Sequence, residues 1–108
     1  MDDRKEKYQA RAEILKAMAH PSRLRMLDAL KSGELCVGEL QELVRSDLST
    51  VSRHLSVMRS AGLLSSRREA NQILYALRVP CVLKTFECVE AVLREDARSA
   101  RRLAARAS

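Results

Sequence analysis

The sequence predicts a single, mainly α-helical domain with one β-hairpin. A chain of 108 residues, 46% hydrophobic and 31% charged, suits one compact domain with one core. Apolar residues recur at helical spacing in four segments before position 63 and in one after position 79. Between these segments the period changes, because Ile73, Tyr75 and Leu77 alternate as they do in a half-buried strand. We therefore expect five helices and a two-stranded hairpin.

The first three helices precede position 46. A first helix is expected from about Lys5 to His20, and its apolar face is too broad for the core of one small domain to cover. Pro21 suits the first turn of a second helix, and Gly33 suits its end. A third, short helix is expected from about Val37 to Arg45.

The chain is organised around a fourth helix, between Asp47 and Gly62. Asp47 can accept hydrogen bonds from the free N–H groups of the first helical turn. Gly62 tolerates the left-handed conformation that ends many helices. Between them, Val51, Leu55 and Met58 form one apolar stripe. The short third helix, a tight turn and this helix together predict a helix-turn-helix over residues 36–62.

The rest of this helix surface is small, polar and cationic, with no acidic residue from Ser49 to Ala61. Its candidate DNA-binding residues are Ser49, Thr50, Ser52, Arg53, His54, Ser56 and Arg59. Hydroxyl groups and arginines contact phosphates and base edges in the major groove of duplex DNA. We interpret the surface as a DNA-reading face, and the alternative is an ordinary solvated surface. His54 is expected near the DNA backbone, and its alternative role is a hydrogen bond within the helix-turn-helix.

The hairpin, residues 63–77, carries further candidate contacts to DNA. They are Arg67, Arg68, Asn71 and Gln72, which are placed to reach the flanking backbone or a minor groove. The alternative is a solvated turn, and for Glu69 and Ala70 we prefer that alternative.

A last helix is expected from Pro80 to about Arg102, with the apolar stripe Val82, Phe86, Val89 and Leu93. Like the first helix, it exposes more apolar surface than one small domain can cover. Residues 1–20 and 80–103 are therefore interpreted as the dimerisation helices of a homodimer. Residues 104–108 are expected to fray.

Composition narrows the class of function. The chain carries 20 Lys and Arg against 14 Asp and Glu, a formal charge of +6 that favours an anionic partner. With only 3% aromatic residues, it lacks a stacking platform for single strands, so duplex DNA is the better candidate. Two His and three Gly offer neither a readable nucleophile–base pair nor a phosphate loop, so catalysis is not expected. A protein-interaction adaptor that has lost DNA binding stays an alternative.

The three cysteines indicate free thiols in a reducing, cytoplasmic environment rather than a disulfide framework. The sequence contains no apolar run long enough to span a membrane, and its first residues do not resemble a signal peptide.

Three strings, LKAMAHPSRLRMLDAL, GELCVGEL and LSTVSRHLSVMRSAGLLSSRREANQILYAL, give the chain a family resemblance. It resembles the ArsR/SmtB family of bacterial winged-helix repressors over roughly Leu15 to Leu77. The resemblance implies a homodimer that binds palindromic operator DNA and is released by a ligand, often a metal ion. It implies that the helix over residues 49–61 reads DNA and that the hairpin over residues 63–77 is the wing.

The family's usual metal sites are incomplete in this sequence. Cys36 is present, but Gly38 and Gln41 stand where arsenic-sensing members have two further cysteines. As(III) needs about three soft ligands, so sensing through this helix alone is not expected. Where zinc-sensing members use an acid and a His, the chain has Val79 and Cys81.

Cys81 and Cys88 form a different candidate site. Seven positions apart on one helix, they share a face but lie about 10 Å apart along the axis. An antiparallel partner helix could bring Cys81 of one subunit to Cys88 of the other. We hypothesise an inter-subunit thiol site for As(III), another thiophilic ion or an oxidant. The alternative is that these cysteines, and more readily Cys36, only pack as small apolar residues while the inducer is a non-metal metabolite. No cofactor is expected to be required for folding.

Overall fold

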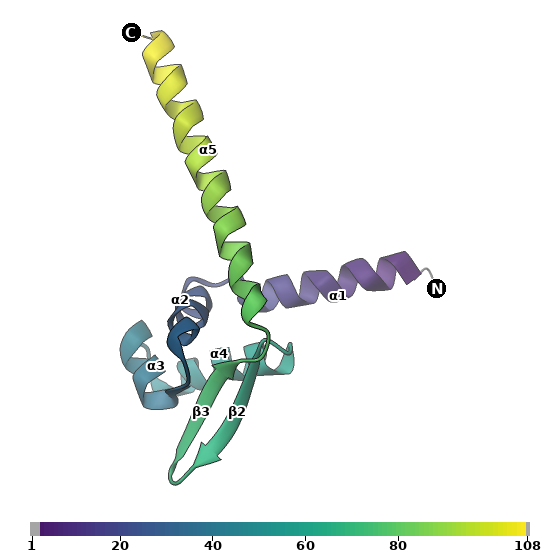
Figure 1. The fold of residues 1–108 in the computed structure, drawn as a ribbon, viewed down its shortest axis with the longest axis vertical. Coiled ribbons are helices and arrows are strands. Elements are labelled where there is room, and N and C mark those ends of the chain that lie inside the picture. The colour runs from purple at the N-terminus through teal and green to yellow at the C-terminus, as the bar shows by residue number, and fades with distance from the viewer. Residues whose placement is uncertain (1–2, 108) are drawn as a thin grey trace.

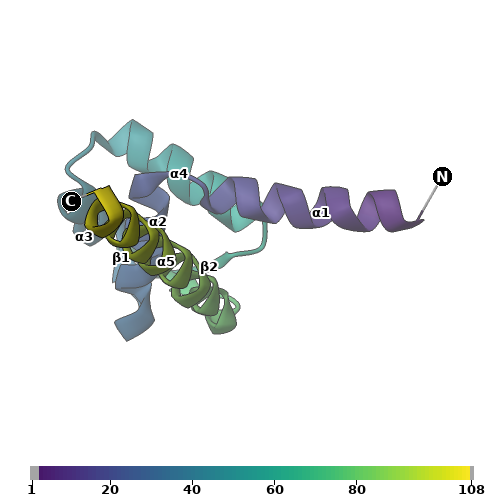
Figure 2. The same ribbon diagram turned by 90° about the horizontal axis from the view of Figure 1, so that it is seen from above.

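The computed structural model describes residues 3–107. Five α-helices, two short 3-10 helices and a three-stranded antiparallel sheet make up this part of the chain (Figure 1). The helices α2, α3 and α4 and the sheet form the body, while α1 and α5 extend from it in different directions (Figures 1 and 2). The expected helical domain with a hairpin is confirmed.

Helices α1 (Asp3–Met18) and α2 (Pro21–Ala29) are separated by a sharp turn at His20. His20 is extended, and its Nδ1 accepts a hydrogen bond of 3.0 Å from the Ser22 N–H, which caps α2. Pro21 follows in the first turn, as predicted. α1 thus ends two residues before the predicted end, because His20 belongs to the cap of the next helix. α2 continues into the 3-10 helix η1 (Leu30–Ser32) before Gly33.

Helices α3 (Val37–Val44) and α4 (Leu48–Ser60) form the helix-turn-helix. Arg45 ends α3 in the left-handed conformation with φ 52°, and the chain turns into α4 within three residues. The start of α3 is held by Glu39, whose carboxylate accepts a hydrogen bond of 3.1 Å from the Cys36 N–H. Gly62 follows α4 with φ 87°, as its predicted capping role requires.

The sheet contains β1 (Leu35–Cys36), β2 (Leu64–Glu69) and β3 (Gln72–Leu77) in the order β1-β3-β2. β2 and β3 are the expected hairpin, with Glu69 opposite Gln72 next to its tip. β1 was not predicted, because a two-residue strand is too short to show a period. It pairs with β3 and ties the hairpin to the start of α3.

The core lies where α2, α3, α4 and the base of the hairpin meet. Its fully buried side chains are Met26, Leu27, Leu40, Val51, Leu55, Met58 and Leu64. The predicted stripe of α4 is therefore confirmed as the face that packs inward. Burial of each such side chain stabilises the fold by about 1.5–3 kcal/mol.

The last part of the chain begins with the 3-10 helix η2 (Pro80–Leu83) and continues as α5 (Lys84–Ala107). The expectation of one regular helix from Pro80 is wrong, since the segment opens with η2 and α5 begins at Lys84. Helix α5 extends to Ala107, and the fraying expected from residue 104 stays a prediction. Good helix formers fill its last turns, and Glu95 lies 3.8 Å from Arg98 and 3.4 Å from Arg102. Ser108 lies outside the described residues.

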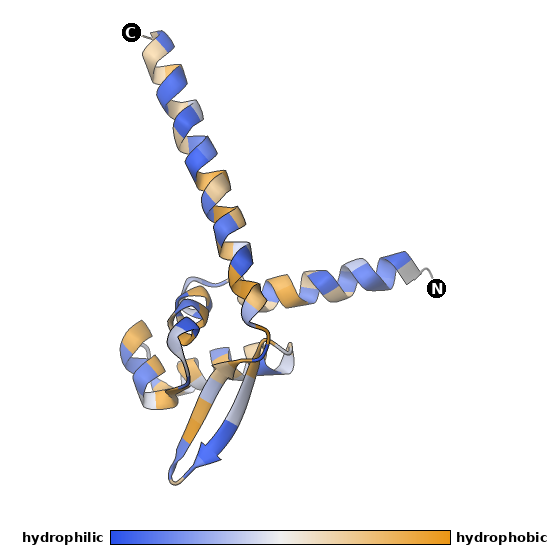
Figure 3. Cartoon of the chain, viewed as in Figure 1, coloured by the Kyte–Doolittle hydropathy of each residue, from blue (hydrophilic) through white to orange (hydrophobic). Residues whose placement is uncertain are grey.

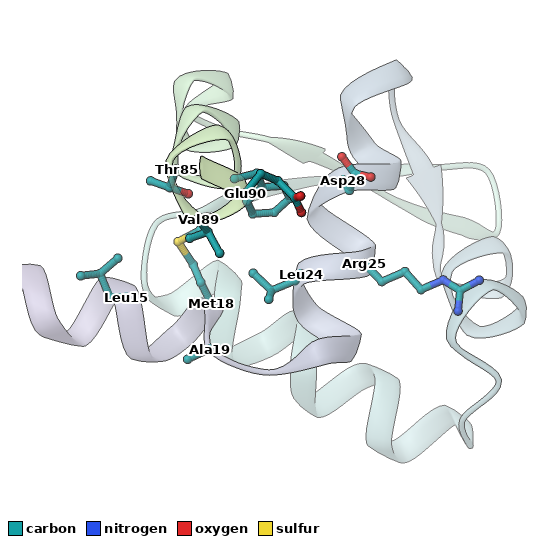
Figure 4. A pocket seen from close by; sticks show the side chains of 10 residues that line it. Leu15, Met18, Ala19, Leu24, Arg25, Asp28, Thr85, Val89 and Glu90 are labelled. Atoms are coloured by element: carbon teal, nitrogen blue, oxygen red, sulfur yellow. The ribbon is translucent and has the colours of Figure 1, made fainter. Parts of the chain in front are cut away.

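Both projecting helices contain hydrophobic residues among hydrophilic ones, as the hydropathy colours show (Figure 3). Tyr8 and Leu15 on α1 are 65% and 57% exposed, and Val89 and Leu93 on α5 are 57% and 56% exposed. Between the end of α1, α2 and the start of α5 lies a largely apolar hollow of about 570 Å³ (Figure 4). No helix in residues 3–107 is long and apolar enough to cross a membrane.

Candidate nucleic-acid interface

Asp47 fixes the start of α4. Its carboxylate accepts hydrogen bonds from the Thr50 N–H at 2.7 Å and from the Ser49 hydroxyl at 3.0 Å. These hydrogen bonds, that from Thr50 above all, hold the pKa of Asp47 below its ordinary value. The charged carboxylate also stabilises the positive end of the helix dipole. The first turn of α4, with its hydroxyl groups, is therefore held in one conformation.

The outer face of α4 is open to solvent. Six of the seven candidates predicted on this helix are exposed: Ser49, Thr50, Ser52, Arg53, Ser56 and Arg59. Val51, Leu55 and Met58 hold the opposite face in the core with no exposed surface. The result is one continuous outer face of hydroxyl groups and two guanidinium groups on a rigid helix. Such a surface can donate hydrogen bonds to phosphates and base edges in a major groove.

His54 is the exception, and its expected place near the DNA backbone is wrong. The residue is only 6% exposed, and its Nδ1 accepts a hydrogen bond of 2.9 Å from Nε of Arg23. Its ring lies 4.4 Å from the ring of His20, centroid to centroid. Burial first, and then the nearby charges of His20, Arg23 and Arg53, lower the pKa of His54. His54 therefore makes a structural hydrogen bond, but to α2, and not within the helix-turn-helix of residues 36–62 as the alternative had it.

The burial of His54 could have been predicted from its spacing in the sequence. It lies three residues after Val51 and four before Met58, which is the spacing of the buried face. Its partner, Arg23, is 31 residues away and has no signal in the sequence.

The hairpin presents its candidates at its tip and on the adjoining parts of β2 and β3, beyond the core. Arg68, Asn71 and Gln72 are exposed, and Ala70 makes the turn with φ 53°. Arg68 has no ion-pair partner within residues 3–107. The tip thus offers one unpaired cation and two side-chain amides to a partner.

Arg67 is also exposed but is already held by two carboxylates. Its Nε and Nη2 donate to the two oxygens of Glu34 at 2.8 and 2.9 Å, and Nη2 lies 3.0 Å from Glu69. The bond to Glu34 raises the pKa of Arg67, and the bond from Arg67 lowers the pKa of Glu34. Sequence reasoning missed Glu34, which lies 33 residues from Arg67 just before β1.

Leu48 was also missed. It is the first residue of α4 and is 54% exposed beside Ser49. Apolar side chains at such positions contact the methyl group of thymine. Its spacing from Val51 suggests a buried residue, but α4 begins beyond the edge of the core.

The cysteines are dispersed. Cys36 is half-buried at the start of α3, whereas Cys81 and Cys88 are exposed. Cys81 lies in η2 and Cys88 in α5, so the assumption of one regular helix through both is wrong. Neither side chain is buried within one chain, and their packing in a dimer stays an open alternative. Within the described residues, no group of three or more His, Cys, Asp or Glu side chains could hold a metal ion.

Comparison with known proteins gives consistent matches. Residues 20–66 match the family model described as "Bacterial regulatory protein, arsR family". The chain is 40% identical to the biofilm growth-associated repressor of Agrobacterium fabrum over 75% of this chain and 69% of the relative. It is 39% identical to the nodulation protein NolR of Rhizobium meliloti over 79% of this chain and 70% of the relative.

Solved structures show the same fold. NolR from Sinorhizobium fredii matches with a TM-score of 0.76 and 35% identity, covering 85% of this chain and 93% of that one. The homodimeric winged helix-turn-helix DNA-binding domain Mb0332 from Mycobacterium bovis matches with a TM-score of 0.75 and 32% identity. That match covers 90% of this chain and 91% of the other.

Proposed function

Because this chain belongs to the arsR family of bacterial regulatory proteins, we propose that it is a sequence-specific DNA-binding transcriptional repressor that acts as a homodimer in the cytoplasm. The observation that carries the proposal is the exposed hydroxyl and arginine face of α4 beside the wing. Ser49, Thr50, Ser52 and Arg53 enter the major groove, while Ser56 and Arg59 contact its edges. Arg68, Asn71 and Gln72 meet the flanking backbone or minor groove.

The dimer uses α1 and α5. Apolar residues on α5 follow a three-four spacing, at Phe86, Val89, Leu93, Ala100 and Leu103, and Asp96 takes the one polar position between them. Such a face is typical of a helix that packs against another helix. The Mycobacterium bovis relative is homodimeric, which supports a homodimer here. Two-fold symmetry then places two copies of α4 on successive major grooves, so the operator is a palindrome.

Release from the operator is proposed to follow a change at these dimer helices. A ligand, or modification of Cys81 and Cys88, alters the angle between the subunits and hence the spacing of the two α4 helices. Both cysteines are exposed on the segment that carries the proposed interface, which supports this position for the signal.

The proposal is tested with Arg53→Ala in a gel shift on the duplex upstream of the chain's own coding sequence. We expect loss of the shifted band, because a bidentate contact to a base contributes about 1–3 kcal/mol and a phosphate contact adds to that. The dimer mass, measured by light scattering, should not change, since Arg53 is exposed on α4. Lys31→Ala, which removes an exposed charge from η1, is the matched control. Full affinity in Arg53→Ala would contradict the proposal.

A further inference from the structure

The two wing arginines project from opposite faces of the sheet, because successive residues of a strand alternate. Arg68 shares a face with Leu64, which is 2% exposed and packs in the core among the helices. The Arg68 side of the wing is therefore the side on which α4 lies, and β2 contacts α4 directly. Arg67 lies on the other face, paired in register with Leu74, which in turn pairs with Cys36 of β1.

On that second face, two carboxylates neutralise the charge of Arg67. Glu34 holds its guanidinium through two hydrogen bonds of 2.8 and 2.9 Å, the fork geometry that most strongly binds a carboxylate. Glu69 adds a contact of 3.0 Å, so one positive and two negative charges give the cluster a net charge of −1. Nε and Nη2, the edge of the guanidinium that would bind a phosphate through two hydrogen bonds, are already engaged, and the charge of the group is balanced by two carboxylates.

We infer that Glu34 is a specificity-determining residue of DNA binding, which with Glu69 keeps Arg67 away from phosphates and leaves Arg68 as the cation of the wing. The inference rests on the proposed function. The wing is electrostatically one-sided: DNA approaches the Arg68 face, next to α4, and is repelled from the face of Glu34. Arg67 acts as a positioning residue that ties the hairpin to the start of β1.

The one-sided charge of the wing mainly lowers the affinity for DNA that lacks the operator sequence. At the operator, the base contacts of α4 fix the approach, so the wing meets DNA through Arg68. On other sequences binding is almost entirely a matter of phosphate contacts, and the protein samples many orientations. A second free wing cation would add one phosphate contact in those orientations, worth about tenfold in affinity near 0.1 M salt.

The test is the double variant Glu34→Gln, Glu69→Gln, compared with wild type on two probes. One probe is the duplex upstream of the chain's own coding sequence, and the other is a random-sequence duplex of equal length. We expect the variant to bind the random duplex about tenfold more tightly, with a salt slope steeper by about 0.9. Operator affinity should rise less, so that the ratio of the two affinities falls. Arg68→Ala should instead weaken binding and reduce the slope by about 0.9.

The matched control is the double variant Glu87→Gln, Glu90→Gln, which raises the net charge by the same two units on exposed positions of α5. Circular dichroism confirms that each variant is folded, as expected for exposed side chains. If the wing double variant has the same affinities and salt slope as the α5 double variant, while wild type still shifts the operator probe, this inference alone is overturned. Wild type that shifts neither probe overturns the proposed function and this inference with it.

Discussion

His54 illustrates how one side chain can link the reading helix to the rest of the molecule. It is buried on α4, accepts a hydrogen bond from Arg23 of α2 and lies against the ring of His20. His20 caps α2, and Arg23 also donates from Nη1 to the Ala17 carbonyl at the end of α1 at 3.3 Å. The three side chains therefore connect α4 to the junction from which α1, a proposed dimer helix, leaves the body. The role of His54 is to position α4 rather than to contact DNA.

A double-mutant cycle between Arg23 and His54 measures this connection. His54→Ala should lower the free energy of unfolding by about 1–3 kcal/mol, because the guanidinium of Arg23 loses its acceptor in a partly buried site. Arg23→Ala should cost a similar amount, and the coupling between the two should be about 1 kcal/mol. Urea unfolding at one fixed protomer concentration gives these values, since stability of a dimer depends on concentration. Additive single effects would contradict the connection.

The pH dependence of stability follows from the same burial. The folded state lowers the pKa of His54 below its ordinary value near 6.5, so the folded protein keeps this imidazole neutral. As pH falls from about 7 through 6.5, the unfolded chain binds a proton that the folded chain does not. The free energy of unfolding should therefore decrease as pH falls through this window, until the lower folded pKa is reached.

His54→Asn keeps an acceptor near the position of Nδ1 but cannot be protonated. Its unfolding free energy should change less between pH 7 and 5.5 than that of wild type. The pKa values of Asp47, Glu34 and Glu39 are also lowered in the folded state, but these carboxylates affect stability at lower pH than this range. His20→Asn keeps a capping side chain but removes one of the charges that lower the pKa of His54, so it should reduce the pH dependence only in part. An unchanged pH dependence in His54→Asn would count against a buried neutral imidazole.

At the scale of elements, features that depend on residues close in the sequence could be predicted, and features that depend on distant residues could not. Caps and periodicity predicted α4, its Asp47 cap and its buried stripe, because these depend on neighbours within one or two turns. β1 and the ion pair of Glu34 with Arg67 could not be predicted, since they arise from pairing across more than 30 residues. His54 shows both effects: spacing indicated a buried face, but only the position of Arg23 explains how an imidazole is tolerated there.

The exposed stripe of α5 leads to a prediction for this element. Leu93→Glu should convert the dimer to a monomer, because the side chain is 56% exposed in one chain and its burial against a partner would contribute about 1.5–3 kcal/mol in each subunit. The subunit itself should stay folded, and operator binding should weaken because two half-sites are no longer bound together. Sedimentation velocity and the gel shift measure these two effects. Arg101→Glu on the same helix is the control, and a monomeric Arg101→Glu would show that charge alone is responsible.

At the scale of the whole molecule, the dimer axis decides whether the exposed cysteines meet. Cys81 lies in η2, between the wing and the proposed interface, and Cys88 lies one turn into α5, within the stretch that carries the interface stripe. In a two-fold dimer with antiparallel contacts, a pair formed by Cys81 and the other subunit's Cys88 occurs twice. A disulfide there requires Cα atoms about 4.4–6.8 Å apart. A bond at this place would fix the angle between subunits, and with it the spacing of the two α4 helices.

Mild oxidation with diamide tests this arrangement. Wild type and Cys36→Ser should form a covalent dimer on a non-reducing gel, whereas Cys81→Ser and Cys88→Ser should each fail to form it, because either change removes both inter-subunit pairs. Oxidised wild type should then bind the operator probe at least tenfold more weakly, and dithiothreitol should restore binding. The Cys81→Ser, Cys88→Ser double variant should bind equally with and without diamide. Cross-linking that survives in Cys88→Ser would instead indicate a pair of Cys81 residues at the axis. Operator release by diamide in the double variant would remove these cysteines from the signal.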